Sequence, residues 1–171
     1  DSILSSLCLN KKIQNSDSTA VIVSDTLYQL HKNYIDNSLK DLNNFEIILM
    51  NDKEENKSYQ YAEGFLEKFI KKGMSRNSYV ISIGGGVVGD FSGFLSAIYM
   101  RGIPVVQVPT TLLSMVDSSI GGKVAVNLSI GKNIAGVFHQ PFIVISDISF
   151  LRTLPENEFK NGLTESLKHA F

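Results

Sequence analysis

Short apolar runs recur along this chain of 171 residues, and longer segments with helical periodicity separate them. The runs occupy residues 19–24, 45–50, 79–83, 103–108 and 142–146. A short run that is apolar throughout is typical of a strand buried on both faces, as in a parallel sheet covered by helices. The alternation therefore predicts an α/β fold with a mostly parallel sheet and helices on both faces.

The segments between the runs are expected to be helical, apart from two polar regions. The expected helices cover residues 3–13, 27–39, 58–72, the segment from the glycine turn to about residue 100, residues 111–118, and a last segment from about residue 155. Residues 51–57 and 121–136 are expected to form loops. Polar side chains follow the ends of the strands, which is where ligands of such sheets bind.

The composition argues against several classes of partner. The formal net charge is −1 and no long basic or acidic block occurs, so neither nucleic acid nor an anionic membrane is expected as a partner. The sequence contains no run of about 18 apolar residues that would cross a bilayer. Cys8 is the only cysteine, which excludes an intrachain disulfide and favours a cytoplasmic setting.

The sequence GGGVVG at residues 84–89 satisfies the pattern G-x-G-x-x-G between an expected strand and an expected helix. Glycine lets the backbone approach a phosphate, and a helix N-terminus favours its negative charge. However, two features differ from an ordinary Rossmann fingerprint. The motif follows the third strand instead of the first, and no acidic residue lies about 20 positions further on. Nucleotide binding and a tight structural turn remain alternatives. Asp90 is interpreted as complementing the helix dipole from the first turn.

A second group of polar residues lies in or beside glycine-rich segments: Asp117, Lys123, Lys132 and Asn133. With Arg101 they place three cations and two polar groups near what is expected to be one edge of the sheet. Such a set suits an anionic, hydroxylated small molecule. The alternative is a solvated loop with helix caps.

Two residues on the last expected helix have spacing that is compatible with a metal. Glu165 and His169 are four positions apart and could share one, although an exposed pair is the commoner meaning of this spacing. His31 and His139 form no metal-binding spacing.

The motifs together resemble those of 3-dehydroquinate synthases, with the family's spacing kept between them. The matching segments are residues 84–90, 99–102, 107–113, 116–123, 131–133, 138–141, 153–155 and 162–168. Before residue 80 the resemblance is thinner. Residues 52–58 are similar to the family's D-G-E-x-x-K-S, with Lys53 in place of the glycine.

The resemblance implies a Rossmann-like NAD-binding domain and an enzyme of the shikimate pathway. The family uses NAD and a divalent metal, zinc or cobalt, to convert 3-deoxy-D-arabino-heptulosonate 7-phosphate into 3-dehydroquinate and phosphate. Oxidation of a hydroxyl acidifies the neighbouring C–H, phosphate is eliminated, the ketone is reduced again, and an aldol step closes the ring. Because NAD is regenerated, the net reaction is that of a phosphate-eliminating lyase.

The resemblance also implies roles for individual residues. The expected cofactor site comprises Asp25, Asp52, Glu54, Glu55, Lys57, Gly85, Gly86, Val87, Gly89, Asp90, Thr110, Thr111, Lys123, Lys132, Phe150, Leu151, Arg152 and Thr153. The expected catalytic residues are Asp117, Lys123, Asn133, Lys168 and Arg101. Arg101 matches an arginine that reaches the neighbouring subunit's substrate, which implies a homodimer. Glu165 matches the family's glutamate metal ligand, whereas His169 matches no ligand and is left out.

The chain is interpreted as the NAD-binding half of such an enzyme. Residues 1–154 are expected to form the NAD-binding domain, and residues 155–171 the start of the family's C-terminal helical domain. Two histidine metal ligands and further substrate-binding lysines and an arginine belong to that domain and are not in this sequence. We therefore expect the fold and weak NAD binding to be retained, but not turnover.

Three other functions are compatible with parts of the sequence. Another NAD- and metal-dependent sugar-phosphate cyclase would share the fold and both cofactors. An iron-type alcohol or glycerol dehydrogenase would share the glycine turn but release NADH, and it lacks the pattern at residues 116–123. A non-catalytic nucleotide-binding module would need no second domain.

Overall fold

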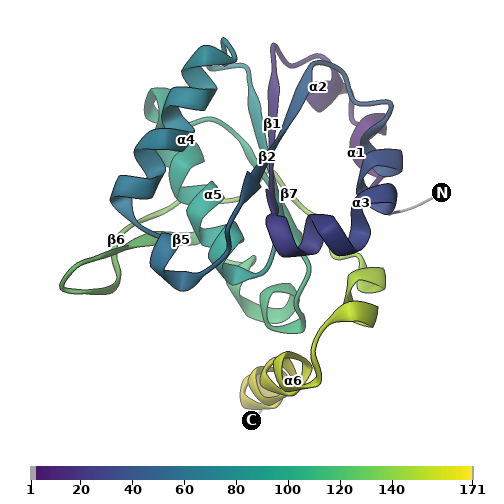
Figure 1. Ribbon diagram of the computed structural model, residues 1–171, viewed down its shortest axis with the longest axis vertical. Coiled ribbons are helices and arrows are strands. Elements are labelled where there is room, and N and C mark those ends of the chain that lie inside the picture. The colour runs from purple at the N-terminus through teal and green to yellow at the C-terminus, as the bar shows by residue number, and fades with distance from the viewer. Residues whose placement is uncertain (1–2, 171) are drawn as a thin grey trace.

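A computed structural model describes residues 3–170 of the chain. Its centre is a five-stranded parallel sheet with the strand order β2-β1-β3-β4-β7, as Figure 1 shows. The strands are β1 (Thr19–Ser24), β2 (Phe45–Met50), β3 (Tyr79–Gly84), β4 (Val105–Pro109) and β7 (Ile143–Val144). The α/β fold with a mostly parallel sheet is thus confirmed.

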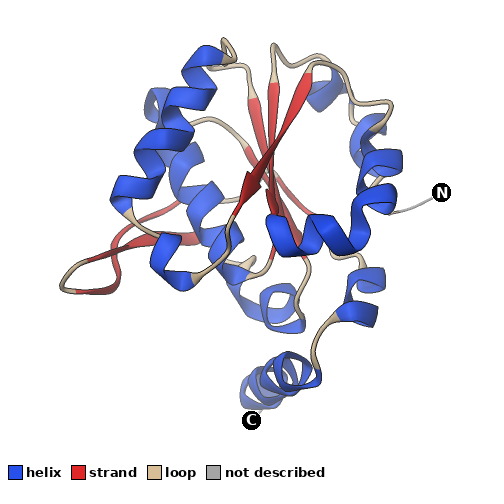
Figure 2. Cartoon of the chain, viewed as in Figure 1, coloured by secondary structure: helices blue, strands red, loops and turns tan. Residues whose placement is uncertain are grey.

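Helices cover both faces of this sheet (Figure 2). They are α1 (Ser6–Leu9), α2 (Lys11–Gln14), α3 (Asp25–Leu39), α4 (Tyr59–Lys71) and α5 (Gly86–Ile98). The last helix, α6 (Glu156–Ala170), lies away from both faces, beyond the carboxyl ends of the strands (Figure 1). Side chains alternate along each strand between two buried clusters, because successive residues of a strand point to opposite faces. Ala20 and Ile22 of β1 pack with α4 and α5, and Val21 and Val23 pack with α1, α2 and α3.

The first expected helix is divided into two short ones. The backbone of Asn10 is extended (φ −78°, ψ 108°), so the helix cannot continue through this residue. The Asn10 side chain instead accepts hydrogen bonds from the backbone N–H groups of Lys12 and Ile13 and caps α2. The other short elements are four: 3-10 helices at Glu54–Asn56, Tyr99–Arg101 and Ile148–Thr153, and a π-helix at Ser114–Ser118.

The prediction of a loop over residues 121–136 is wrong. This region forms an antiparallel hairpin of β5 (Lys123–Leu128) and β6 (Gly131–Phe138). Val124 and Val126 are buried against α5 and alternate with the less buried Lys123, Ala125 and Asn127, which is the pattern of a half-buried strand. The glycines and lysines of the region hid this alternation.

Close packing of the hairpin on α5 requires a glycine in the helix. A Cβ atom built on Gly93 would lie 2.4 Å from Cγ1 of Val124, so a larger residue would push the hairpin away. The hairpin projects beside the carboxyl ends of the strands (Figure 1). Among residues 3–170, no helix is both long and apolar enough to cross a membrane.

Candidate functional site

The carboxyl ends of the strands bring together polar residues from distant parts of the sequence. Ser24, the last residue of β1, caps α3 by accepting a hydrogen bond from the N–H of Leu27 (3.2 Å). Its hydroxyl donates to the carboxylate of Asp52, which follows β2 (2.7 Å). The adjacent ends of two strands are thereby joined, and the Asp52 carboxylate is held at the edge of the sheet.

A cleft of about 170 Å³ opens beside this pair. Its lining includes several residues expected in the cofactor site, namely Asp52, Gly85, Thr110, Thr111, Phe150 and Thr153. Asp25 lies beside the cleft in the first turn of α3, where its carboxylate accepts from the N–H of Thr26. Leu151 and Arg152 do not line the cleft. Strands β1 to β4 and the segment after β7 therefore converge on one small cavity.

The glycine turn contributes Gly85 to the lining of this cleft and begins α5. Gly85 is the N-cap of α5, and no side chain caps the first turn of that helix. A Cβ atom on Gly85 would lie 3.0 Å from Cγ2 of Thr111, and one on Gly84 would lie 2.6 Å from Cβ of Val88. The turn is therefore both a tight packing element and an uncapped helix N-terminus. Such a terminus presents backbone N–H groups to an anion.

A larger pocket of about 530 Å³ lies between α5 and the hairpin. It is lined by Asp90, Asp117, Ser118, Lys123, Val124, Ala125, Asn133, Ile134, Gly136, Val137 and Phe138. The structure thus brings together Asp117, Lys123 and Asn133, as expected from the sequence. The apolar wall supplied by β6 is not expected from the sequence, because the prediction of a loop in this region leaves no strand to form it.

Lys57 connects Asp90 with Asn133 of the larger pocket. Only 4% of this lysine is exposed, and its ammonium group donates to Asp90 (2.8 Å) and to Oδ1 of Asn133 (2.6 Å). Burial raises the pKa of Asp90, and the hydrogen bond from Lys57 acts against that shift. The interpretation of Asp90 as a dipole-complementing residue of the first turn is wrong: it lies beyond the first turn of α5 and pairs with Lys57.

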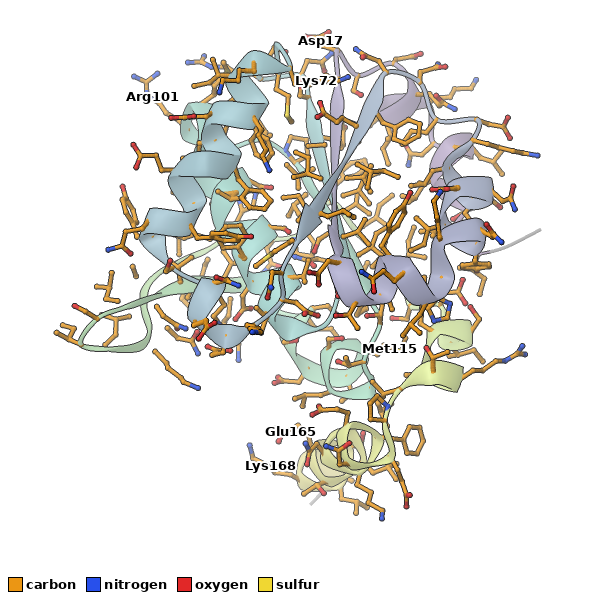
Figure 3. The ribbon with its side chains drawn as sticks, in the orientation of Figure 1. Asp17, Lys72, Arg101, Met115, Glu165 and Lys168 are labelled. Carbon is orange, nitrogen blue, oxygen red and sulfur yellow. The ribbon has the colours of Figure 1, made fainter. Side chains whose placement is uncertain are left out.

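Arg101 does not lie near these residues. It follows the C-terminal end of α5, whereas the pockets lie at the N-terminal end, and Figure 3 shows it on the opposite side of the molecule from Glu165 and Lys168. The expectation that Arg101 shares one sheet edge with the other cations is therefore wrong. Lys132 is exposed on β6, beside Asn133.

Helix α6 packs against the segment that leads to Asp117. A Cβ atom on Gly162 would lie 2.6 Å from Cβ of Leu112, so the two segments are in close contact. On the same helix, Lys168 donates to Glu165 (2.9 Å), and this bond, with a contribution from Asp117, raises the pKa of Lys168.

The described residues do not assemble a metal site around Glu165. Within residues 3–170, no group of three or more His, Cys, Asp or Glu residues is arranged to hold a metal ion. The side chain of His169 lies outside the described part of the chain. One carboxylate does not make a metal site, so the residues present do not fit a metal by themselves.

The sequence matches the family model described as 3-dehydroquinate synthase N-terminal over residues 47–161. The chain belongs to this family. A curated relative, the 3-dehydroquinate synthase of Thermoanaerobacter sp. strain X514, is 47% identical over 163 residues, which is 94% of this chain and 45% of the relative. The chain therefore spans about half the length of the curated relatives that it matches.

Solved structures of two other synthases have the same fold. A 2-deoxy-scyllo-inosose synthase, complexed with carbaglucose-6-phosphate, NAD+ and Co2+, is 28% identical with a TM-score of 0.89, and the match covers 97% of this chain and 46% of that one. The 2-epi-5-epi-valiolone synthase of Streptomyces hygroscopicus subsp. jinggangensis 5008, with NAD+ and Zn2+ bound, is 28% identical with a TM-score of 0.83, covering 93% and 45%. An iron-containing alcohol dehydrogenase at 17% identity and a TM-score of 0.73, covering 97% and 48%, shares the fold alone.

Proposed function

We propose that the full-length protein containing this chain is a 3-dehydroquinate synthase. It would convert 3-deoxy-D-arabino-heptulosonate 7-phosphate into 3-dehydroquinate and phosphate, with NAD restored at the end of each cycle. The observation that carries the proposal is the polar pocket of Asp117, Lys123 and Asn133 beside the uncapped N-terminus of α5. The 47% identity to a curated synthase supports the same reaction rather than that of the cyclases at 28%.

The cleft at the glycine turn would hold part of a bound NAD. The first backbone N–H groups of α5 would bind the pyrophosphate, and the glycines leave no Cβ atom in its way. Asp52, oriented by Ser24, would accept hydrogen bonds from the adenosine ribose. When bound, NAD supplies reversible hydride transfer from and to a substrate hydroxyl carbon.

The larger pocket fits an anionic, hydroxylated substrate. Lys123 in this pocket, and Lys168 on α6 outside its lining, would bind carboxylate or phosphate oxygens as point charges. Asp117 would accept a hydrogen bond from a substrate hydroxyl, and the amide of Asn133 would donate one. The apolar wall of β6, with Phe138 and Val137, would exclude water from one side of the substrate.

We propose that the whole protein also uses a divalent metal. Glu165 would supply one ligand, and the remaining ligands would come from outside residues 3–170. The cobalt and zinc ions of the two related cyclases support a divalent metal as a cofactor of the whole protein.

A homodimer is proposed from the position of Arg101. Met100, Arg101 and Gly102 all have positive φ angles (48°, 72° and 116°), which is a costly arrangement for the two non-glycine residues. This backbone holds the guanidinium on the far side of the domain from its own pocket, where a second subunit can use it. A cytoplasmic location remains a prediction from the sequence.

The test is the reaction of the purified full-length protein with the seven-carbon phosphate, NAD and a divalent metal. We expect stoichiometric release of phosphate, formation of 3-dehydroquinate by mass spectrometry, and no net NADH. Lys123→Met should lower kcat/KM by about 100-fold, on the scale of losing one preorganised charge contact. Lys72→Met is the matched control, because Lys72 lies at the opposite edge of the domain (Figure 3) and should leave the rate unchanged.

Three outcomes would contradict the proposal. Accumulation of NADH would indicate a dehydrogenase. A cyclic product from a different sugar phosphate, with no product from this one, would indicate another cyclase. Stabilisation by NAD without turnover of any sugar phosphate would indicate a binding module.

A further inference from the structure

The bulge in the β5–β6 hairpin determines how Asn133 meets the larger pocket. The strand pairing runs from Val126 opposite Ala135 to Leu128 opposite Gly131, so the two strands are out of step between these pairs. Asn133 lies in this irregular stretch with a left-handed backbone (φ 57°). A bulge of this kind re-aims a side chain, and it is common beside active sites.

The side chain of Asn127 faces this bulge from the other strand and makes three hydrogen bonds. Its Oδ1 accepts from the backbone N–H of Asn133 (2.8 Å). Its Nδ2 donates to the backbone carbonyl of Glu54 (3.1 Å) and to the Glu54 carboxylate (2.8 Å). The orientation of the amide is determined by these partners, because one only donates and the other two only accept.

The backbone of Asn127 is also tied to the segment that carries Lys57. The N–H of Asn127 donates to the carbonyl oxygen of Lys57 (2.7 Å), and an isolated bridge pairs Asn127 with Ser58. The ammonium group of Lys57 in turn donates to Oδ1 of Asn133. Asn127, Asn133, Lys57 and Glu54 therefore form a closed ring of contacts between the hairpin and residues 54–58.

This ring selects one orientation of the Asn133 amide. An ammonium group has no acceptor, so the oxygen of the Asn133 amide must face Lys57. Among the described residues, none accepts a hydrogen bond from its NH2 group. Because Asn133 lines the larger pocket, that NH2 group is the donor available to a molecule bound there.

We propose that Asn127 is a positioning residue that holds the bulge so that the Asn133 amide donates to the substrate. This inference rests on the proposed function. Asn127 does not line the pocket itself, and it acts on the substrate only through Asn133. Replacing a positioning residue can lower the reaction rate by about 100-fold, because a shift of about 1 Å in a group that contacts the substrate is enough to cause such a loss.

The test is a double-mutant cycle on the full-length protein, measured as kcat/KM for the seven-carbon phosphate. We expect Asn127→Ala and Asn133→Ala each to lower kcat/KM by about 10- to 100-fold. In the Asn133→Ala background, Asn127→Ala should cost less than about twofold, because its route to the substrate is already lost. Asn10→Ala is the control, since it also removes an asparagine's hydrogen bonds to backbone N–H groups but lies in α2's cap, away from the pocket.

If Asn127→Ala does not fold, a second pair of variants tests the contact between the side chains of Asn127 and Glu54. Asn127→Asp puts a carboxylate against the Glu54 carboxylate and should lower kcat/KM. Glu54→Gln restores a donor–acceptor pair with Asp at position 127. The double variant, compared with Glu54→Gln alone, should therefore lose less of its kcat/KM than Asn127→Asp loses relative to the wild type. Absence of any recovery would overturn the proposal.

The outcomes separate the inference from the proposed function. A wild-type protein that makes no 3-dehydroquinate would refute the proposed function and the inference with it. If the protein is active but Asn127→Ala leaves kcat/KM unchanged, the inference alone is overturned. The same holds if Asn127→Ala lowers kcat/KM equally in the wild-type and Asn133→Ala backgrounds. An active protein that is insensitive to Asn133→Ala would do the same.

Discussion

The ion pair of Lys57 and Asp90 supports a quantitative prediction. The exposed fractions of their side chains are 5% and 19%, so replacing Lys57 by Met leaves a largely buried carboxylate without its cation. Removing one partner of a buried pair costs about 3–5 kcal/mol, and the partial exposure of Asp90 places this case near 3 kcal/mol. For a chain of this length we expect the melting temperature to fall by roughly 6–12 °C.

The free energy of unfolding that Lys57→Met loses should depend on pH in a defined direction. Burial raises the pKa of folded Asp90 above its unfolded value, and loss of Lys57 removes the main opposing influence, so the pKa rises further. A raised carboxyl pKa carries no penalty below the unfolded pKa, and the penalty grows as pH rises through the folded pKa. The variant should therefore be close to wild type in acid and clearly less stable at neutral pH.

Urea unfolding from pH 4 to 8, followed by circular dichroism, measures this difference. Lys71→Met is the matched control, because Lys71 pairs with Glu67 at 3.5 Å with exposed fractions of 77% and 60%. An exposed pair of this kind contributes at most about 1 kcal/mol. A deficit in Lys57→Met that is independent of pH, or no larger than that of the control, would refute the reasoning.

Two further predictions concern packing and the cofactor cleft. Gly93→Ala should destabilise the chain by about 1–3 kcal/mol in urea unfolding, because the new methyl group meets Val124. Gly64→Ala is the control, and it should stabilise the chain by about 0.5–1 kcal/mol, since nothing lies within 4 Å of the new Cβ atom. Ser24→Ala should cost about 1 kcal/mol through loss of the α3 cap, and it should also weaken NAD binding in calorimetry because Asp52 loses its donor. Unchanged NAD affinity in Ser24→Ala would contradict the proposed role of Asp52.

Much of the fold could be predicted because it depends on local sequence. Each strand of the parallel sheet is a short, predominantly apolar run, and parallel strands alternating with helices place all their carboxyl ends at one edge. The polar residues after β1, β2, β3 and β4 therefore meet as predicted, and Asp52, Gly85 and Thr110 line one cleft. The hairpin was not predicted, because its glycines and lysines masked an alternation that only burial against α5 makes evident.

The sequence by itself determined the fold class, the strands of the parallel sheet and the types of side chain at the sheet edge, since these follow from periodicity and from the direction of the chain. Only the tertiary structure decided which of these side chains act together. Lys57 and Asn133 are 76 positions apart, and no spacing rule connects them, yet one ammonium group joins Asn133 to Asp90. Arg101 was separated from the other cations by the length of α5. Such partnerships depend on how helices and the hairpin pack, because packing sets distances that the order of residues does not.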